Sequence, residues 1–443
     1  MKKILIFGAG KSAACLIDYV GRTCEENNWQ LLLCDADLLL AQSKIANCKN
    51  AIALSVDVGN DSGRINLIQD ADIVISMLPP HLHFLVARDC VSFSKHLLTA
   101  SYIDEEIQKL DKQIEKKGLL FLCEMGLDPG IDHMSAMKII NGIKKQGGKI
   151  ISFKSHCGGL VSPESDDNPW HYKITWNPKN IVMAGAAGAI YRSNKKTVEI
   201  PYENIFSDCK DVEVPGLFSL AWYPNRDSLT YINRYGLYDI DTFIRTTLRH
   251  PSFCRGWNKM VNMGFVGLND HEEIKNCKTF NEWYQLKSGK TKFDILHDGN
   301  EVEFEEQVNY LGLQSNQIIE TGIKNSAFLL QNILEEKLSM HPHDKDMVVM
   351  LHEIGYEIDG ETREVRSCLV VKGEDQQRTA MAKTVGLPLG IAAKLILQGK
   401  IKLTGLHVPV LPEIYEPVLA ELEIHQVKFS EEVRMHGTNK KTG

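Results

Sequence analysis

Residues 2–20 read KKILIFGAGKSAACLIDYV, in which an apolar run meets a glycine turn and continues into a second apolar stretch. This order predicts a strand, a tight turn and a helix. The turn has the form GxGxxA, with Gly8, Gly10 and Ala13 at its small positions. In dinucleotide-binding folds these positions permit the turn, the approach of the backbone to a pyrophosphate, and close packing of helix on strand. The stretch therefore predicts a dinucleotide site at a helix N-terminus, the alternative being a nucleotide-free α/β turn.

Six short apolar runs with helical stretches between them fill residues 1 to about 128. They are ILIFGAG, QLLLCDAD, AIALSVDV, ADIVISMLP, KHLLTASY and GLLFLCEMG. Strands separated by helices predict a parallel sheet with right-handed crossovers. The run ADIVISML has no polar face, as expected of a strand covered on both sides. We therefore expect an α/β protein that begins with a Rossmann-like, doubly wound parallel sheet.

An acidic residue ends the second run. Asp35 lies 22 residues after Ala13, where the dinucleotide fingerprint places the acid that binds the adenosine ribose hydroxyls. A carboxylate there repels a 2′-phosphate, and no arginine stands beside Asp35. We expect NAD as the cofactor and keep NADP as the second possibility.

Polar residues also follow the other predicted strands. Asp57 follows the third run, where an acid often lies near the adenine, and the loop from Ser76 to His83 could line the middle of the cofactor. The stretches TASYIDEE (99–106) and CEMGLDPGIDH (123–133) end the fifth and sixth runs. Since ligands bind at the carboxyl ends of the strands in a doubly wound sheet, we expect these stretches in the site.

Asp128 and Asp132 flank a Pro-Gly turn in the last of these stretches. Asp128 could orient a substrate amine or a water molecule. The alternative is that an aspartate here caps the helix that follows. Cys157 precedes a Gly-Gly pair and is interpreted as a small buried residue rather than a nucleophile.

Arginines beyond the first domain bear on the substrate. Arg226 lies in WYPNRDS (222–228), and Arg245 and Arg249 lie in IRTTLRH. The planar fork of arginine matches a carboxylate. Arg245 and Arg249 are four residues apart, so a predicted helix could present both on one face. The alternative for each is a solvated surface position or an ion pair within its own domain.

The rest of the chain mixes strands and helices. KIISFKSHCGGL, WHYKITWN and TVEIPY predict strands, and residues 231 to 343, including IDTFIRTTLRHPSFCRGWNKMVNMGF, predict mainly helices. KDMVVMLHEIGYEIDGETREVRSCLVVKG predicts two strands around the turn signal DG. RTAMAKTVGLPLGIAAKLILQGKI predicts a helix interrupted near Gly386 and Pro388, and the final MHGTNKKTG a frayed polar tail.

Composition limits the classes of function. The 443 residues carry a net charge of about −7, so no global basic field would attract nucleic acid. No apolar run approaches the roughly 20 residues that cross a bilayer, and no signal-peptide layout is seen, so we expect a cytoplasmic protein without a membrane partner. The 11 cysteines are scattered singly, which favours reduced thiols and no metal site. His133, His156 and His171 lack ligand spacing and are interpreted as structural.

A set of motifs resembles a known family. In order, SYI, MGLDPGIDHM, CGGL, NPWHYKITW, YPNRDS, TLR, KDMVVM, MAKTVGLP and PEIY resemble saccharopine dehydrogenases of the L-glutamate-forming type, from about residue 4 to residue 428. The resemblance implies a homodimer of three-part chains. Residues 1–129 with part of about 386–425 would form the Rossmann domain. Residues 130–230 with about 344–385 and the C-terminal end would form an α/β substrate and dimerisation domain, into which 231–343 insert a helical domain.

The resemblance also implies site residues. Its cofactor contacts fall on Gly8, Gly10, Lys11, Ser12, Ala13, Asp35, Asp57, Leu78, Ala100, Ser101, Leu127 and Asp128. Its contacts to saccharopine, a small molecule with three carboxylates, fall on Ser101, Tyr102, Asp128, Arg226, Thr247, Leu248 and Arg249.

Two stretches and one further residue depart from the family's usual pattern. Val161-Ser162 replaces Pro-Ala, and NPWHYKITW replaces NPLGYKFSW, so both could reshape the wall of the substrate pocket. Fungal members carry an arginine where this chain has Asp35, and they use NADP.

The implied reaction converts saccharopine, NAD(P)⁺ and water to L-glutamate, 2-aminoadipate 6-semialdehyde and NAD(P)H. Asp128 is the first candidate for orienting the amine or the water, and Tyr102 is the second. One alternative is a related imine reductase of polyamine metabolism, which should carry acids in place of Arg226 and Arg249. The other is a non-catalytic NAD-binding protein.

Overall fold

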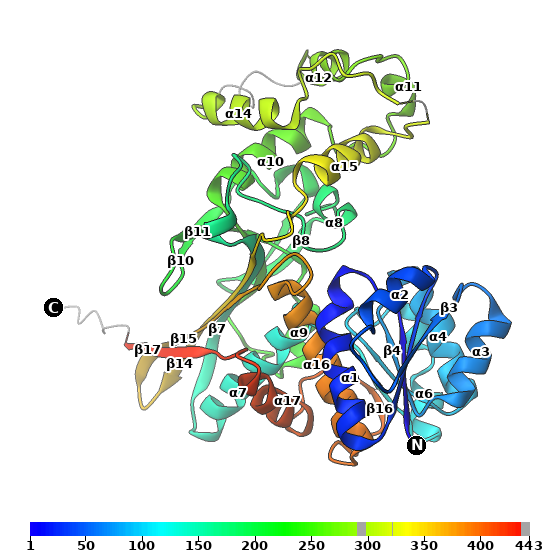
Figure 1. Ribbon diagram of the computed structural model, residues 1–443. Coiled ribbons are helices and arrows are strands. Elements are labelled where there is room, and N and C mark those ends of the chain that lie inside the picture. The colour runs from blue at the N-terminus through cyan, green and yellow to red at the C-terminus, as the bar shows by residue number, and fades with distance from the viewer. Residues whose placement is uncertain (290–297, 321, 436–443) are drawn as a thin grey trace, which may run out of the picture. The chain divides into compact units, whose positions relative to one another are not determined.

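The computed structural model describes residues 1–289, 298–320 and 322–435, and it divides into two compact units (Figure 1). The first unit comprises Met1–Gly147 and Gln377–Phe429. The second comprises Gly148–Gln376 and the chain from Ser430 onward. Contacts therefore place residues 130–147 in the first unit and keep 231–343 within the second. The predicted boundary at 129 and the separate helical insertion stay predictions.

The first unit is built on a seven-stranded sheet in the order β16-β6-β5-β4-β1-β2-β3, and all pairs are parallel. The first six strands follow the order 3-2-1-4-5-6 of doubly wound dinucleotide-binding sheets. Their bounds are β1 (Lys3–Phe7), β2 (Gln30–Asp35), β3 (Ala51–Ser55), β4 (Ile73–Ser76), β5 (His96–Thr99), β6 (Leu120–Leu122) and β16 (Gly405–His407). The predicted fold class is confirmed, and all six predicted strands form.

Helices cover both faces of this sheet. Helices α1 and α16 lie on one face, and α3, α4 and α6 lie on the other (Figure 1). The helical segments are η1 (Lys11–Ala13), α1 (Ala14–Asn27), α2 (Leu38–Lys44), α3 (Asp61–Asp70), α4 (Pro80–Ser92), α5 (Glu105–Gln108), α6 (Asp111–Lys116), α7 (Ile131–Lys145), α16 (Ala380–Leu397) and α17 (Pro412–Ile424).

Helix α16 differs from its prediction. It is continuous through Gly386 and Pro388 and is not interrupted there. A Cβ on Gly386 would lie 2.8 Å from the backbone nitrogen of Leu16, and one on Gly390 would lie 2.6 Å from the ring of Tyr19. These glycines therefore serve close packing against α1 rather than helix termination. By length and mean hydropathy (1.5) α16 could cross a membrane, but 78% of that window is buried inside the protein, as in a core helix.

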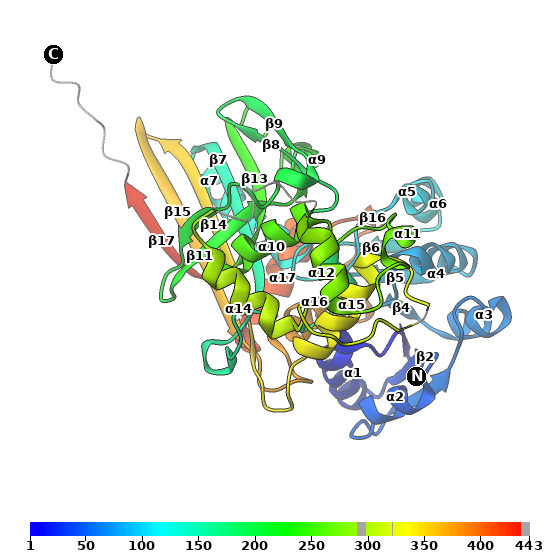
Figure 2. The same ribbon diagram turned by 90° about the horizontal axis from the view of Figure 1, so that it is seen from above.

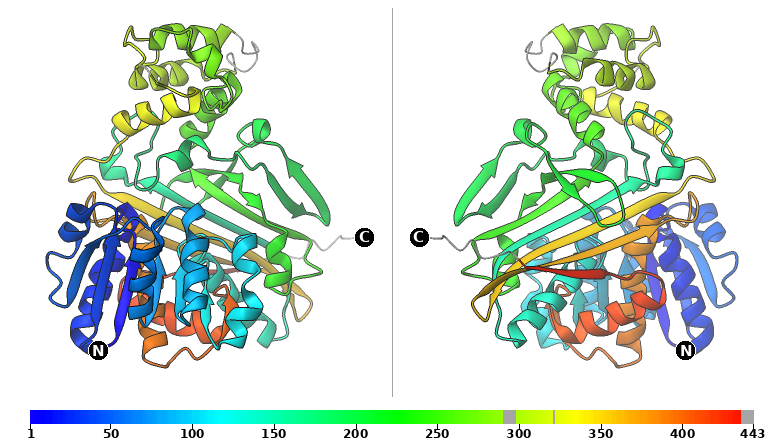
Figure 3. Two further views of the ribbon diagram at one scale, coloured as in Figure 1. Left: turned by 90° about the vertical axis from the view of Figure 1, so that its right-hand side faces the viewer. Right: turned by 90° about the vertical axis from the view of Figure 1, so that its left-hand side faces the viewer.

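The second unit contains a mixed ten-stranded sheet. Its main path is β10-β11-β13-β7-β14-β15-β17, with β8, β9 and β12 attached beside β13. Figure 2 shows β13, β7, β14 and β15 side by side, and Figure 3 shows β17 at the edge beside β15. The strands are β7 (Lys149–Val161), β8 (Ala189–Ser193), β9 (Lys196–Ile200), β10 (Lys210–Glu213), β11 (Ser219–Pro224), β12 (Arg226–Asp227), β13 (Thr242–Arg249), β14 (Asp346–Ile358), β15 (Glu361–Lys372) and β17 (Ser430–Met435).

The hairpin predicted around the DG turn is confirmed as β14 and β15. Two other expectations were wrong. Residues 242–249 were expected in a helix, yet they form β13, parallel to β7 and antiparallel to β11. WHYKITWN was expected as a strand, but it forms only an isolated bridge at Ile174. Its alternating pattern arises because Trp170, Tyr172 and Ile174 are buried in a side-chain cluster, without a neighbouring strand.

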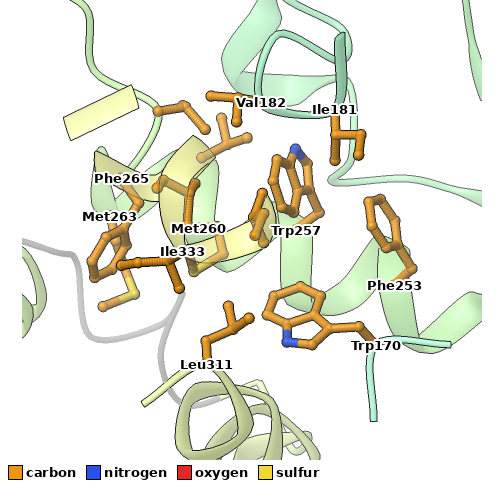
Figure 4. Packing of buried hydrophobic residues seen from close by; sticks show 14 of the residues in the cluster. Trp170, Ile181, Val182, Phe253, Trp257, Met260, Met263, Phe265, Leu311 and Ile333 are labelled. Carbon is orange, nitrogen blue, oxygen red and sulfur yellow. The ribbon is translucent and has the colours of Figure 1, made fainter. Parts of the chain in front are cut away.

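Helices of the second unit enclose this cluster. Figure 4 shows Trp170, Phe253 and Trp257 packed with Leu311 and Ile333. The indole nitrogen of Trp170 donates to the carbonyl of Gln307 at 3.1 Å. The helical segments are η2 (Pro163–Ser165), α8 (Lys179–Val182), η3 (Tyr202–Asn204), α9 (Thr230–Arg234), α10 (Pro251–Met263), α11 (His271–Ile274), α12 (Phe280–Gly289), α14 (Glu301–Leu311) and α15 (Ser326–Lys337). The predicted tail lies, except for Met435, outside the described residues.

The contact between α1 and α16 makes a testable prediction. Gly386→Ala should lower the free energy of unfolding by about 1–3 kcal/mol, because the added methyl meets the α1 backbone. Gly142→Ala is the matched control, since a Cβ there meets nothing within 4 Å. That control should gain about 0.5–1 kcal/mol from better helix propensity. Denaturant titration measures both, and equal gains for the two variants would show that α1 and α16 do not pack this closely.

Candidate active site

The glycine turn after β1 has the shape that a dinucleotide site requires. Gly8 has φ of 101°, and a Cβ on it would lie 2.8 Å from the carbonyl oxygen of Met77, so only glycine fits. A Cβ on Gly10 would meet nothing within 4 Å, because Gly10 faces open space before η1 and α1. The turn therefore presents bare backbone at a helix N-terminus, which suits a pyrophosphate.

Asp35 fastens this turn to the end of β2. One carboxylate oxygen accepts the backbone N–H of Ala9 at 2.7 Å, and the other accepts that of Asp37 at 3.0 Å. The side chain of Asp37 in turn caps α2 by accepting the N–H of Leu40. The negative charge of Asp35 is thus fixed beside the glycine turn, where the fingerprint expects the ribose-binding acid.

Hydrogen bonds stabilise the loop after β3. Asp57 accepts the N–H of Gly59 within its own turn. The buried guanidinium of Arg64 donates to the carbonyl of Val58 and forms an ion pair with Asp89 at 2.7 Å. Asp57 therefore stands on a supported loop at the carboxyl edge of the sheet. Leu78, after β4, is partly buried against the apolar cluster on one side of the sheet.

A hydrogen-bonded chain links the ends of β4 and β5. Nδ1 of His83 lies 2.8 Å from the hydroxyl of Ser76, and Nε2 lies 2.7 Å from the hydroxyl of Ser101. Burial lowers the pKa of His83 to about 4, so this imidazole is neutral at neutral pH. His83 therefore fixes Ser101, for which the sequence predicts contacts to cofactor and substrate. The sequence indicated the loop but not this link.

The turn after β6 packs against the same loop. The backbone N–H groups of Glu124 and Met125 donate to the carbonyls of Ser101 and Thr99, both at 3.0 Å. A Cβ on Gly126 would lie 3.0 Å from the Cβ of Ala100. These contacts bring together two pairs of predicted site residues, Ala100 and Ser101 after β5 and Leu127 and Asp128 after β6.

Asp132 and Asp128 have different surroundings. Asp132 is buried in the first turn of α7 and accepts the N–H of Gly130 at 2.6 Å. The N-cap of α7 is Gly130, so neither aspartate is the N-cap residue of that helix. Asp128 is partly exposed and precedes a cis proline, Pro129. His133 is buried between Glu124 at 3.0 Å and Asp132 at 3.5 Å, as expected of a structural histidine.

In the second unit, β13 presents the predicted substrate residues. Side chains of a strand alternate, so Arg245, Thr247 and Arg249 share one face. The guanidinium of Arg245 lies 4.3 Å from the ring centre of Tyr231. Both arginines do share a face, but through the period of a strand and not through the predicted helix. Leu248 points to the other face and is fully buried in an apolar cluster, so only its backbone could contact a ligand on the arginine face.

Arg249 is the most deeply enclosed of these cations. It is 6% exposed, and its guanidinium lies 5.3 Å from the ring centre of Tyr172 and 5.7 Å from that of Phe253. Nη1 donates to the carbonyl of Leu248 at 2.8 Å, whereas Nε has no hydrogen-bond partner in the described chain. A buried N–H of a charged group without a partner is costly, so an anion bound at this guanidinium would be stabilised.

Arg226 lies on β12, beside β8, and is exposed with φ of 51°. The neighbouring Asn225 donates its N–H to the carbonyl of Arg245 at 2.9 Å, and the hydroxyl of Ser228 accepts the N–H of Arg245 at 3.0 Å. The segment that carries Arg226 is thus attached to β13. Arg226 on β12 and the two arginines on β13 thus belong to one sheet, in which β8 pairs with both strands.

No group of three or more His, Cys, Asp or Glu side chains that could hold a metal ion is found in residues 1–289, 298–320 and 322–435. The absence of a metal from the reaction stays a prediction. His156 is buried, with Nδ1 2.7 Å from the hydroxyl of Thr246 and Nε2 3.3 Å from Glu353, which is consistent with a structural role.

Comparisons with known proteins cover nearly the whole chain. Residues 4–122 match the saccharopine dehydrogenase NADP binding domain, and residues 126–427 match the saccharopine dehydrogenase C-terminal domain. Saccharopine dehydrogenase [NADP(+), L-glutamate-forming] of Saccharomyces cerevisiae is 32% identical, over 95% of this chain and 97% of that protein. The apo structure of the L-Glu-forming enzyme from the same yeast superposes with a TM-score of 0.89, at 32% identity, over 98% of this chain and 100% of that one.

A longer relative is also similar. Alpha-aminoadipic semialdehyde synthase of Arabidopsis thaliana is 31% identical over 97% of this chain but only 44% of its own length. This chain therefore spans about half the length of that relative.

The hydrogen bonds that join Ser76, His83 and Ser101 predict that the stability of the protein depends on pH. The unfolded chain binds a proton on His83 below its ordinary pKa of 6.5, whereas the folded protein resists it down to about 4. Stability should therefore fall as pH drops from 6.5 to 4, by about 3 kcal/mol through this residue. His83→Gln should flatten this dependence in denaturant titrations at several pH values. His81→Gln, exposed on the same helix, should leave the dependence nearly unchanged, and identical curves for both variants would contradict a buried neutral His83.

Proposed function

Because this chain belongs to the saccharopine dehydrogenase family, we propose that it oxidises saccharopine, reversibly, to L-glutamate and 2-aminoadipate 6-semialdehyde with a nicotinamide cofactor and water. The observation that carries the proposal is Arg249, buried against Tyr172 and Phe253 with its Nε unpaired in the described residues. Saccharopine carries three carboxylates, and the guanidinium fork is the side-chain group that matches a carboxylate best. Arg245 and Arg226, on two strands of the same sheet, supply further positive charge.

The polyamine alternative fits less well. An imine reductase for polyamines would need acids to hold substrate amines, whereas this chain has arginines at 226 and 249. The alternative of a non-catalytic NAD-binding protein differs from the proposal in turnover alone, so an assay decides between them.

We assign the cofactor site to the carboxyl edge of the first unit's sheet. Gly8 permits the turn, Gly10 leaves its backbone open to a pyrophosphate, and Asp35 is fixed where the adenosine ribose would lie. The family model and the yeast relative name NADP. In this chain, however, residues 35–43 contain Asp35 and Asp37 and no lysine or arginine. Because a 2′-phosphate would meet a fixed carboxylate, we propose that NAD is preferred.

A nicotinamide held at this edge would supply a hydride acceptor for the methylene carbon next to the secondary amine of saccharopine. The chain's own groups must hold the carboxylates, orient the amine and place the water. We assign Asp128 to orient the amine nitrogen or the water, since its turn is closed by the bond between Gly130 and Asp132. Tyr102 is the second candidate, because it follows Ser101, which His83 holds.

The remaining expectations stay predictions. A homodimer rests on the resemblance of the sequence to the family, and a cytoplasmic location without nucleic-acid or membrane partners rests on composition. Gel filtration with light scattering would measure the oligomeric state.

The function is tested by the absorbance at 340 nm of the protein with saccharopine and NAD⁺, and in parallel with NADP⁺. We expect NADH to form at a rate proportional to protein concentration. No signal with either cofactor would reject the proposed reaction.

Arg249→Met should raise the KM for saccharopine by about 10–100-fold, because it removes a charge-assisted bond worth about 1.5–3 kcal/mol. The KM for NAD⁺ should stay near the wild-type value. Arg363→Met is the matched control, since this arginine lies on β15 and is paired with Glu361. An unchanged KM for saccharopine in Arg249→Met would remove Arg249 from the site.

Asp35→Asn should weaken the preference for NAD⁺ over NADP⁺ by about tenfold or more in kcat/KM. The amide oxygen can still accept the N–H of Ala9, while the charge that repels a 2′-phosphate is lost. Asp37→Asn, which keeps the helix cap, should change the ratio much less. A wild-type protein that prefers NADP⁺ would contradict the assignment of Asp35.

A further inference from the structure

Two histidines outside the predicted site stack face to face. The ring centres of His171 and His250 are 3.8 Å apart, with 28° between the ring planes. Each is the direct chain neighbour of a residue at the carboxylate position: His171 precedes Tyr172, and His250 follows Arg249. Arg249 also lies over the ring of Tyr172. The segment 171–172 and the segment 249–250 therefore make two adjacent contacts, one between the histidines and one between the arginine and the tyrosine.

Each imidazole is held on its own side. Nδ1 of His171 lies 2.6 Å from a carboxylate oxygen of Asp166, so it carries a hydrogen that it donates. Nδ1 of His250 accepts the N–H of Ser252 at 3.3 Å and so caps the first turn of α10. Because that nitrogen must keep its lone pair, the cap requires a neutral His250.

The surroundings of His250 favour this neutral form. Burial and the neighbouring His171 lower the pKa of His250 to about 4. The charged groups that face it from the packed elements are Arg255 of α10 and Glu303 of α14, which form a bidentate pair at 2.7 Å, and Asp166 behind His171.

The backbone conformation at His171 is unusual for a histidine. His171 has φ of 48°, in the left-handed region that glycine adopts freely and other residues adopt at a cost. The turn is closed by Asn168, whose side chain accepts the N–H of Trp170 and donates to the carbonyl of Tyr172. A glycine would serve this turn without strain, so the backbone conformation alone does not account for a histidine at this position.

We propose that His171 and His250 are a positioning pair that holds Tyr172 and Arg249 in the geometry that receives a substrate carboxylate. The inference rests on the proposed function for the identity of the substrate. The stack fixes the two segments one residue away from the arginine and its aromatic wall. Neither imidazole takes part in the oxidation itself.

His171→Gly and His250→Asn test the pair. Glycine removes the ring and relaxes the backbone, and asparagine keeps a helix-capping oxygen. Each variant should raise the KM for saccharopine by about tenfold, with kcat and the KM for the cofactor changed by less than about twofold. The double variant should resemble either single one, because both remove the same contact.

Two outcomes overturn the inference. One is a KM for saccharopine within about twofold of wild type in both variants, and the other is multiplication of the two effects in the double variant. A merely structural role would lower the thermal midpoint and change both KM values together. His343→Asn, an exposed histidine, is the matched control and should change neither KM.

Failure of the proposed function is distinguishable from failure of the pair. If the wild-type protein does not oxidise saccharopine, the function fails, and the pair is tested with L-glutamate as a carboxylate ligand. L-Glutamate should then raise the thermal midpoint of the wild-type protein more than that of His171→Gly. Equal shifts, or no shift in the wild-type protein, would overturn the inference.

Discussion

The parallel pairing of six strands in the first unit is the constraint on which the cofactor site depends. It brings the ends of β1 to β6 to one edge, so residues more than a hundred positions apart in the chain become neighbours. Side chains and backbone groups then join these ends. Asp35 accepts the N–H of Ala9, the carbonyl of Ser101 accepts the N–H of Glu124, and the hydroxyl of Ser101 is hydrogen-bonded to His83. A nucleotide at this edge would contact loops that are already joined to one another by hydrogen bonds.

The elements of the first unit could be predicted because their signals are local. Each strand is an apolar run, and Asp35 stands at a fixed distance from the glycine turn. The prediction was wrong where one pattern served two structures. Residues four apart share a face in a helix and also in a strand, so the common face of Arg245 and Arg249 was found although β13 was not. Gly386 and Pro388 suggested a break in α16, whereas close packing against α1 explains the glycine.

The supporting residues of the site could not be predicted in the same way. His83 joins Ser76 to Ser101, and His171 stacks on His250 across 79 positions of sequence. Such contacts depend on the distance between segments in space, and the sequence around a single histidine does not indicate which residue it contacts. The unpaired Nε of Arg249 likewise follows from the walls around it, which come from Tyr172 and Phe253.

The chain passes between its two units three times, and this has a consequence for its synthesis on the ribosome. The first unit receives β1 to β6 early, but α16, β16 and α17 are translated only after Gln376. Until then the face of α1 that packs on α16 has no cover, and the sheet lacks its seventh strand. The nascent chain must therefore carry an incomplete nucleotide fold while β7 to β15 and the helices of the second unit are being made. The unit that starts first is completed almost last.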